Sequence, residues 1–134
     1  MAAPARPNIE VPRNETILIV DDDAGALSAL ADILSIEGYA VQTVSNGREA
    51  FDLLRDSRPP ALIILDMLMP VMDGWQFLAE MKSDSKFANT PVVVVSGLDT
   101  QIDADAVFQK PINLESLLRT VTDLVEAKPA AHHV

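Results

Sequence analysis

The chain has 134 residues, contains no cysteine and carries a formal net charge of −10. This length suits one domain with a real core, and the lack of thiols excludes disulfides and thiol chemistry. The acidic balance argues against direct binding of nucleic acid, whose phosphate backbone selects basic surfaces. No apolar run reaches the length of a membrane span and no hydrophobic export signal stands at the N-terminus, so we expect no membrane insertion and a cytoplasmic location.

Apolar segments and amphipathic segments alternate along most of the chain. We expect residues 1–14 to be a disordered lead-in, residues 15–127 to form the domain and residues 128–134 to be a flexible tail. The predicted strands cover residues 16–20, 39–44, 61–65, 91–95 and 107–109. Amphipathic helices are predicted before Gly38, after Asn46, over about 75–83 and after Asn113.

Strands that alternate with helices form a parallel sheet with helices on both faces. Right-handed crossovers bring the carboxyl ends of the strands to one edge, where open α/β sheets bind ligands. The side chains that end or directly follow a strand are Asp21, Asp22, Asp66, Ser96 and Lys110. Each one alone is explicable as loop decoration, but two acidic strand ends, a hydroxyl and an ammonium together predict a site.

The predicted site combines groups for a hard cation with groups for an anion. Mg²⁺ suits Asp22 and Asp66, with Asp21 acting through water, because clustered carboxylates repel one another unless a cation intervenes. Lys110 and Ser96 would be surplus for a cation alone, and they fit the oxygens of a phosphoryl group. A carboxylate nucleophile, Mg²⁺ and an ammonium are the parts needed to move a phosphoryl group onto Asp66.

Other catalytic classes fit the pattern less well. An aspartyl-nucleophile phosphohydrolase generally places a second acid two residues after its nucleophile, where Leu68 stands. No Gly-rich phosphate loop with Lys-Ser/Thr is present, which argues against nucleotide binding. Ser96 has no histidine partner within residues 15–127, which argues against a hydrolase triad.

These motifs, in this order, resemble the receiver domain of bacterial two-component response regulators. The resemblance covers residues 16 to about 126 and rests on Asp21-Asp22, Leu65-Asp66, Pro70, Asp73-Gly74, Ser96-Gly97 and Lys110-Pro111. It implies a flavodoxin-like, doubly wound (βα)5 three-layer α/β sandwich with a parallel sheet of order 2-1-3-4-5.

The resemblance also implies a role for each residue of the site. Asp66 would be the phosphoacceptor, Lys110 and Ser96 would contact the phosphoryl group, and Mg²⁺ would be bound by Asp21, Asp22, Asp66 and the backbone carbonyl of Leu68. The implied phosphoryl donor is a sensor histidine kinase or a histidine phosphotransfer protein. The chain would signal through protein contacts and would not be an enzyme beyond its own phosphorylation and dephosphorylation. The alternative is a pseudo-receiver, an interaction module that works without phosphate.

Leu68 and Leu98 occupy loop positions that flank the predicted site. Neither side chain can orient an attacking water, and together they would partly exclude it. We therefore expect a phosphorylated form that hydrolyses slowly for this family.

The chain departs from the family pattern before Lys110. The position three residues before it, usually an aromatic switch residue, is Val107, with Phe108 one step later. Ser96 and Lys110 are 14 positions apart (110 − 96), whereas the family uses about twenty or slightly more because a fourth helix lies between them.

We therefore expect the fourth helix to be missing or reduced to a turn. Only ten residues, 97–106, separate Ser96 from Val107. Extended, they reach roughly 33 Å, but as a helix they cover only about 15 Å, which leaves nothing for the turns. We expect one face of residues 92–95 and 107–109 to lose its cover, with Leu98 and Ile102 as the available plugs. That strand 4/strand 5 face would then bind a downstream protein target or a second copy of the chain.

Overall fold

The computed structural model describes residues 16–56, 58–69, 72–97 and 102–131. The elements along these residues are β2 (Thr16–Val20), α2 (Ala24–Ile36), β3 (Ala40–Val44), α3 (Gly47–Arg55), β4 (Leu62–Leu65), α4 (Gly74–Ser83), β5 (Val92–Ser96), β6 (Ala106–Gln109) and α5 (Leu114–Ala131). Each strand lies within one residue of its predicted bounds, because each is a short apolar run between turn residues.

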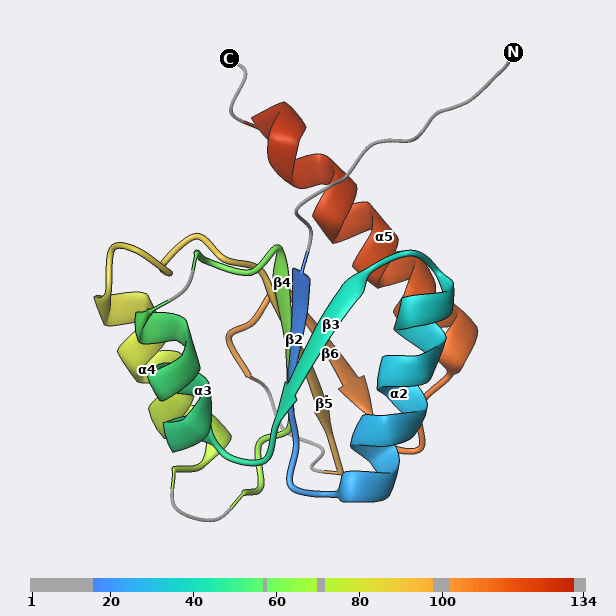
Figure 1. Ribbon diagram of the computed structural model, residues 1–134, viewed down its shortest axis with the longest axis horizontal. Helices are drawn as coiled ribbons and strands as arrows, with labels where there is room; N and C mark the ends of the chain where they lie inside the picture. The colour runs from blue at the N-terminus through green and yellow to red at the C-terminus, as the bar shows by residue number, and fades with distance from the viewer. Residues whose placement is uncertain (1–15, 57, 70–71, 98–101, 132–134) are drawn as a thin grey trace.

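The strands form one parallel sheet of order β3-β2-β4-β5-β6. Counted along the chain this is the predicted order 2-1-3-4-5, which confirms the flavodoxin-like topology. Figure 1 shows the three layers, with α3 and α4 on one face of the sheet and α2 and α5 on the other. Because the strands run in one direction, their carboxyl ends share one edge, at the bottom of Figure 1.

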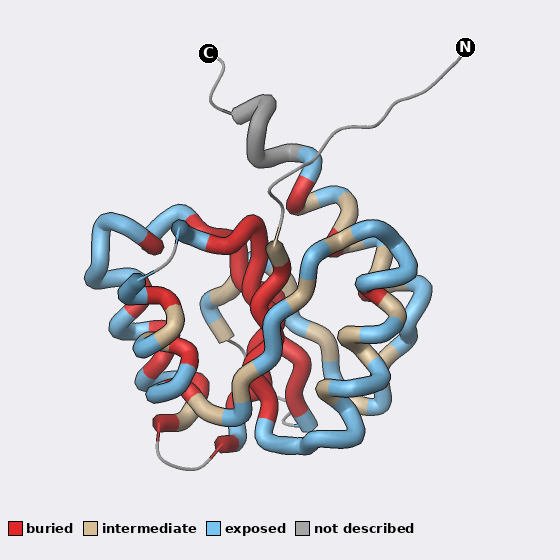
Figure 2. Tube along the Cα trace, viewed as in Figure 1, coloured by how far each residue is buried: buried red, intermediate tan, exposed pale blue. Residues whose placement is uncertain are grey.

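Burial of each strand follows its place in the sheet. Every residue of β4 and β5 is buried, and so is all of β2 except Thr16. The edge strands β3 and β6 contain exposed residues, as the pale segments in Figure 2 show. Strands covered by helices on both faces need apolar side chains on both sides, which explains the continuous apolar runs in the middle of the sheet.

Side-chain caps begin the two short helices on one face. The Asn46 side chain accepts a hydrogen bond from the Glu49 amide at 2.9 Å, as predicted. The Glu49 carboxylate, however, accepts from the amide and hydroxyl of Ser45 at 3.0 Å, one residue before the position a standard capping box uses. In α4 the Asp73 and Gln76 side chains form the reciprocal box. These caps satisfy amides that a helix start leaves without partners.

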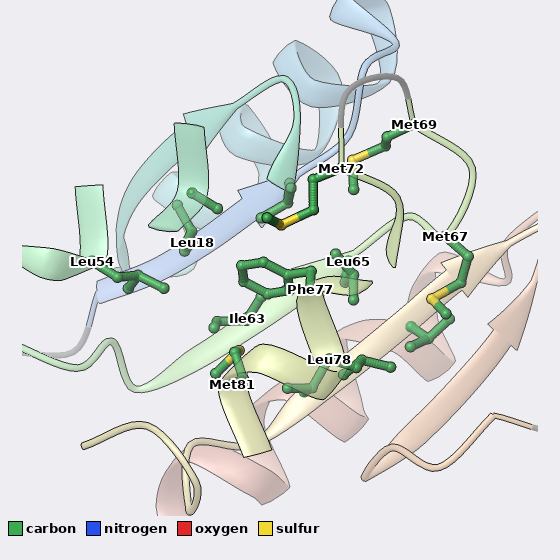
Figure 3. Close-up of a cluster of buried hydrophobic side chains, with 14 of the residues drawn as sticks. Leu18, Leu54, Ile63, Leu65, Met67, Met69, Met72, Phe77, Leu78 and Met81 are labelled. Carbon is green, nitrogen blue, oxygen red and sulfur yellow. The ribbon is translucent and has the colours of Figure 1, made fainter. Parts of the chain in front are cut away.

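The side of the sheet under α3 and α4 is rich in methionine. We call it the methionine face, and its buried residues are Leu18, Val20, Ala50, Leu54, Ile63, Leu65, Met67, Met69, Met72, Phe77, Leu78, Met81, Phe87, Val92 and Val94. Phe77 is fully buried in this cluster, and its ring lies 5.0 Å from that of Phe51, centroid to centroid. In Figure 3 Phe77 stands at the centre of the labelled side chains, with Met72 and Met69 reaching in from the loop after β4.

The side of the sheet under α2 and α5 is lined by aliphatic residues. We call it the aliphatic face, and its buried residues are Ile17, Ile19, Leu34, Ala61, Leu62, Ile64, Val93, Val95, Leu117, Val121 and Val125. Leucine, isoleucine and valine have well-defined rotamers, whereas methionine adapts its shape to irregular gaps. The two faces therefore differ in how firmly their side chains specify one packing.

The connection from β5 to β6 contains no helix among its described residues, which are Gly97 and 102–105; residues 98–101 lie outside the described part. Among the described residues, the fourth helix in chain order is α5, near the C-terminus. Lys82 of α4 binds the connection, because its ammonium donates to the Asp103 carbonyl at 3.0 Å and pairs with the Asp103 carboxylate at 2.6 Å. Asp105 exchanges two hydrogen bonds with the backbone of Val92, each 2.9 Å long.

The expected loss of cover is wrong for β5 and applies only to β6. Every residue of β5 is buried, because Ile102 and Ala104 pack against the methionine face in place of a helix. Ile102 was one of the two predicted plugs, and the other, Leu98, lies outside the described residues. On β6, Val107 is 42% exposed. Among the described residues, the exposed apolar part of the strand 4/strand 5 face thus lies on the edge strand β6.

The last helix is longer than predicted. Asn113 caps it as expected, with its side chain accepting from the Ser116 amide at 3.0 Å. It continues to Ala131, so Lys128–Ala131 are helical rather than part of the predicted tail. Within the described chain, no helix has the length and apolar character needed to cross a membrane.

Candidate functional site

The predicted site residues follow four neighbouring strands at one edge of the sheet. Asp21 and Asp22 follow β2, Asp66 follows β4, Ser96 ends β5 and Lys110 follows β6. Carboxylate oxygens of the three aspartates lie within 4.8 Å of one another. The parallel topology therefore gathers side chains that are up to 89 positions apart in the chain (110 − 21).

Lys110 faces two of the three carboxylates. Its ammonium lies 3.7 Å from an oxygen of Asp21 and 3.9 Å from an oxygen of Asp66. Both aspartates are buried, with 8% and 6% of their surface exposed, whereas Asp22 is exposed. One ammonium thus balances part of a dense negative charge, and the exposed Asp22 opens the cluster to solvent.

Hydrogen bonds of the backbone fix the positions of the residues that carry these side chains. The Asp66 amide donates to the Val20 carbonyl at 2.9 Å, and the Lys110 amide donates to the Ser96 carbonyl at 2.8 Å. The Asp21 carboxylate accepts from the Asp23 amide at 2.9 Å. Ser96 is completely buried at the end of β5, one strand away from Asp66.

The charge of Asp66 is destabilised by its surroundings. Burial raises the pKa of Asp66 above its ordinary value of 3.8, and the neighbouring charges of Asp21 and Asp22 raise it further. The Lys110 ammonium and the Leu68 amide, which donates to the Asp66 carboxylate at 3.4 Å, lower the pKa again without cancelling the rise. A cation placed among the carboxylates would stabilise the ionised form.

The donor set fits Mg²⁺. Three carboxylates close enough to bind one ion supply the hard oxygen ligands that Mg²⁺ prefers. The single ammonium of Lys110 does not balance their combined negative charge. The backbone carbonyl of Leu68 belongs to the loop after β4, two residues beyond Asp66. The Leu68 side chain itself is 54% exposed.

Two glycines hold the loop after Asp66, and sequence analysis missed their contacts. The Gly74 amide donates to the Met67 carbonyl at 2.9 Å, and a Cβ at Gly74 would lie 2.6 Å from the Met67 Cα. A Cβ at Gly47 would lie 2.9 Å from the Met72 carbonyl oxygen. Asp73-Gly74 signalled a turn, but nothing in the sequence showed that both glycines permit close packing of backbones.

The residues that replace the expected aromatic switch lie on different sides of β6. Phe108 packs against the aliphatic face, while Val107 is one of the exposed large apolar residues. Successive strand residues point to opposite faces, so Phe108 cannot substitute for an aromatic at position 107.

Comparison with known proteins gives one family. The model of the response regulator receiver domain matches residues 17–122. Response regulator MprA of Mycolicibacterium vanbaalenii is 34% identical over 117 residues, which cover 81% of this chain and 49% of the relative. Response regulator Rre1 of Synechocystis is 31% identical over 125 residues, covering 87% and 54%. The chain therefore spans about half the length of the curated relatives it matches.

Solved structures agree with the family match. The signal receiver domain of a histidine kinase from Syntrophus aciditrophicus superposes with a TM-score of 0.79 at 33% identity, covering 84% of this chain and 91% of that one. Response regulator TrrA of Thermotoga maritima, solved in complex with Mg²⁺-BeF, gives 0.73 at 28% identity, covering 82% and 98%. The chain therefore belongs to the family of response regulator receiver domains of two-component systems.

Proposed function

We propose that Asp66 accepts a phosphoryl group from a phosphohistidine on a partner protein, in a reaction that requires Mg²⁺. The observation that carries this proposal is the gathering of a buried Asp66 with two further carboxylates and the Lys110 ammonium at one sheet edge. A structural carboxylate would need one partner, whereas this arrangement has groups for both a cation and a phosphoryl oxygen.

Each residue has a distinct part in the proposed reaction. A carboxylate oxygen of Asp66 attacks phosphorus, and the bond between phosphorus and the histidine nitrogen breaks with its electron pair going to the nitrogen. Lys110 pairs with a phosphoryl oxygen, and the buried Ser96 lies at the strand end that faces the same edge. Asp21, Asp22, Asp66 and the Leu68 carbonyl would hold Mg²⁺, which supplies positive charge to the phosphoryl oxygens.

The phosphoryl donor would reach Asp66 along an apolar groove. A cavity of about 210 Å³ lies between α2 and the start of α5, and both Asp66 and Lys110 line it. Its walls include Ala29 and Ile33 of α2 and Leu114 of α5. A helix with an apolar face could seat there and present its phosphohistidine to Asp66, as expected for a sensor histidine kinase or a histidine phosphotransfer protein.

The output would be protein contact rather than turnover of a substrate. The exposed Val107 on the strand 4/strand 5 face offers an apolar contact for a downstream protein or for a second copy. This role places the chain in the cytoplasm, where the phosphohistidine of a sensor kinase is made, and needs neither nucleic acid nor membrane insertion.

Acetyl phosphate labelling tests the proposal. We expect one phosphoryl group per chain in the presence of Mg²⁺, measured by intact mass, and none with the metal chelated or in Asp66→Asn. Asp123→Asn, an exposed change on α5, is the matched control and should label like the unaltered chain. A stable phosphorylated form of Asp66→Asn would contradict the assignment. No labelling of the unaltered chain would favour the pseudo-receiver, an interaction module, which the altered Val107 position also suits.

A further inference from the structure

The loop after Asp66 is clasped at both ends by backbone contacts. At its start, the Gly74 amide binds the Met67 carbonyl at 2.9 Å. At its far end, the Gly47 amide donates to the Met72 carbonyl at 3.4 Å. Gly47 is the first residue of α3, so its amide is one of those that a helix start leaves without a partner inside the helix.

The contact at Gly47 leaves no room for a side chain. A Cβ there would lie 2.9 Å from the Met72 carbonyl oxygen, 2.9 Å from its Cγ and 3.0 Å from its Sδ. The Met72 side chain could move to relieve the last two contacts, but the carbonyl oxygen belongs to the backbone of the loop. A side chain at position 47 would therefore require the Met72 backbone and the start of α3 to move apart.

The same loop carries the Leu68 carbonyl and the Leu68 amide that binds Asp66. Its methionines lie inside the methionine face, at 0% exposure for Met67 and 8% for Met72, so the described residues on either side of 70–71 are held by packing and by glycine contacts. No charged group of the site takes part in these contacts. The position of the loop can therefore be altered without altering a carboxylate or Lys110.

We infer that Gly47 is a positioning residue for the metal site, acting from α3 through the Met72 carbonyl on the loop that bears Leu68. The inference rests on the proposed Mg²⁺ dependence of phosphorylation at Asp66. Residues that orient metal ligands without touching the metal typically change affinity about 10- to 100-fold when they are replaced. Because Gly47 acts at the far end of the loop, we expect the lower end of that range, about a tenfold loss.

The test compares two Gly→Ala variants, each in the first turn of a helix at this sheet edge. Gly47→Ala should weaken the Mg²⁺ dissociation constant about tenfold, measured by amide NMR titration and by fluorescence of Trp75, which is the single tryptophan and directly follows Gly74. Gly25→Ala is the control, since its Cβ would meet only Asp23 Oδ1, at 3.4 Å, and should bind Mg²⁺ within twofold of the unaltered chain. Urea unfolding of the metal-free proteins separates a loss of affinity from a loss of fold.

Each outcome is decisive. Equal affinity in Gly47→Ala and the unaltered chain overturns the inference, and so does an equal loss in both alanine variants. If Gly47→Ala does not fold, the comparison is made between Met72→Ala and Gly47→Ala/Met72→Ala, in which the side-chain contacts are relieved and the carbonyl contact remains. Equal affinity in that pair also overturns it. Absence of Mg²⁺ binding by the unaltered chain would instead contradict the proposed function, so the two failures are distinguishable.

Discussion

The methionine face and the aliphatic face cover the two sides of the same sheet with different types of side chain. The aliphatic face lies under the long helices α2 and α5, of 13 and 18 residues, whereas the methionine face lies under α3 and α4, of 9 and 10. The loop after Asp66 packs its methionines only into the methionine face. The same face also receives the β5–β6 connection through Ile102 and Ala104.

This difference suggests a division of work between the two faces. Methionine side chains adapt their shape, so a core that contains them tolerates small shifts of the loops above it. Aliphatic side chains with fixed rotamers hold strand positions more rigidly. We therefore expect changes at the site to spread through the methionine face, with the aliphatic face as the fixed support.

Truncation of one core residue on each face is expected to give the largest effects and tests the proposed difference between the two faces. Phe77→Ala and Leu117→Ala both remove fully buried side chains and should lower the free energy of unfolding by about 3–5 and 2–5 kcal/mol respectively. Only Phe77→Ala should also weaken Mg²⁺ binding, because the loop methionines pack around Phe77. Urea unfolding and Mg²⁺ titration measure the two effects, and equal changes in Mg²⁺ affinity would refute the division of work.

A polar residue at position 68 should shorten the life of the phosphorylated form. The exposed Leu68 side chain can neither donate nor accept a hydrogen bond, so it cannot orient a water near Asp66. We expect Leu68→Asn to speed loss of the phosphoryl group roughly tenfold, below the 10²–10⁴ of a fully positioned acid or base. The decay of the intact-mass signal measures this rate, and an unchanged decay would show that Leu68 does not control hydrolysis. The second leucine invoked in this expectation, Leu98, lies outside the described residues.

Removal of the Asp66 charge should stabilise the metal-free protein at neutral pH. Because burial raises the pKa of Asp66 above 3.8, the folded state binds this proton more tightly than the unfolded state does. Stability therefore falls as pH rises above 3.8, and the loss is complete above the raised pKa. With metal chelated, Asp66→Asn should melt at a higher temperature than the unaltered chain at pH 7, because it removes the buried charge. The difference should vanish below pH 3.8, and a variant that melts lower at pH 7 would contradict this linkage.

The smallest effect is expected at the ion pair that ties the β5–β6 connection to α4. The Asp103 side chain is 95% exposed and that of Lys82 is 48% exposed, so Lys82→Met should cost only about 0.2–1 kcal/mol, and less at high salt. Arg55→Met, which removes an exposed pair with Asp52 inside α3, is the control for loss of a surface cation. Hydrogen exchange at Asp105 should quicken in Lys82→Met alone, and an equal response in both variants would show that the pair does not hold the connection.

Periodicity and strand ends made the fold predictable, together with the gathering, at one edge of the sheet, of the side chains that end or follow the strands. Residues such as Asp66 and Lys110 follow short apolar runs, and the parallel topology then brings them together whatever the details of packing. The Asn113 cap was predictable for a similar reason, since it depends on residues three positions apart.

Contacts between distant residues could not be predicted in this way. Gly47 contacts Met72, and Lys82 contacts Asp103, only because the helices and loops that carry them pack at particular positions along the sheet. No spacing of residues in the sequence encodes these relative positions. The cover of β5 was predicted only in part: Ile102 was named as a possible plug, but Ala104, a small residue in a polar segment, was not. The helical turns beyond Glu126 were missed because Pro129 and the histidines after it suggested a tail.

The short return from β5 to β6 also alters the entropy of folding. Nine residues, 97–105, separate these two strands, whereas 26 residues, 66–91, separate β4 from β5. Loop-closure entropy grows with the logarithm of length, so closing the shorter loop costs less by about 0.9 kcal/mol, from (3/2)RT ln(26/9). An edge strand of four residues has few partners to hold it. Among the described strands, β6 therefore combines a short length of four residues, a place at the edge of the sheet and the shortest connection from the strand before it.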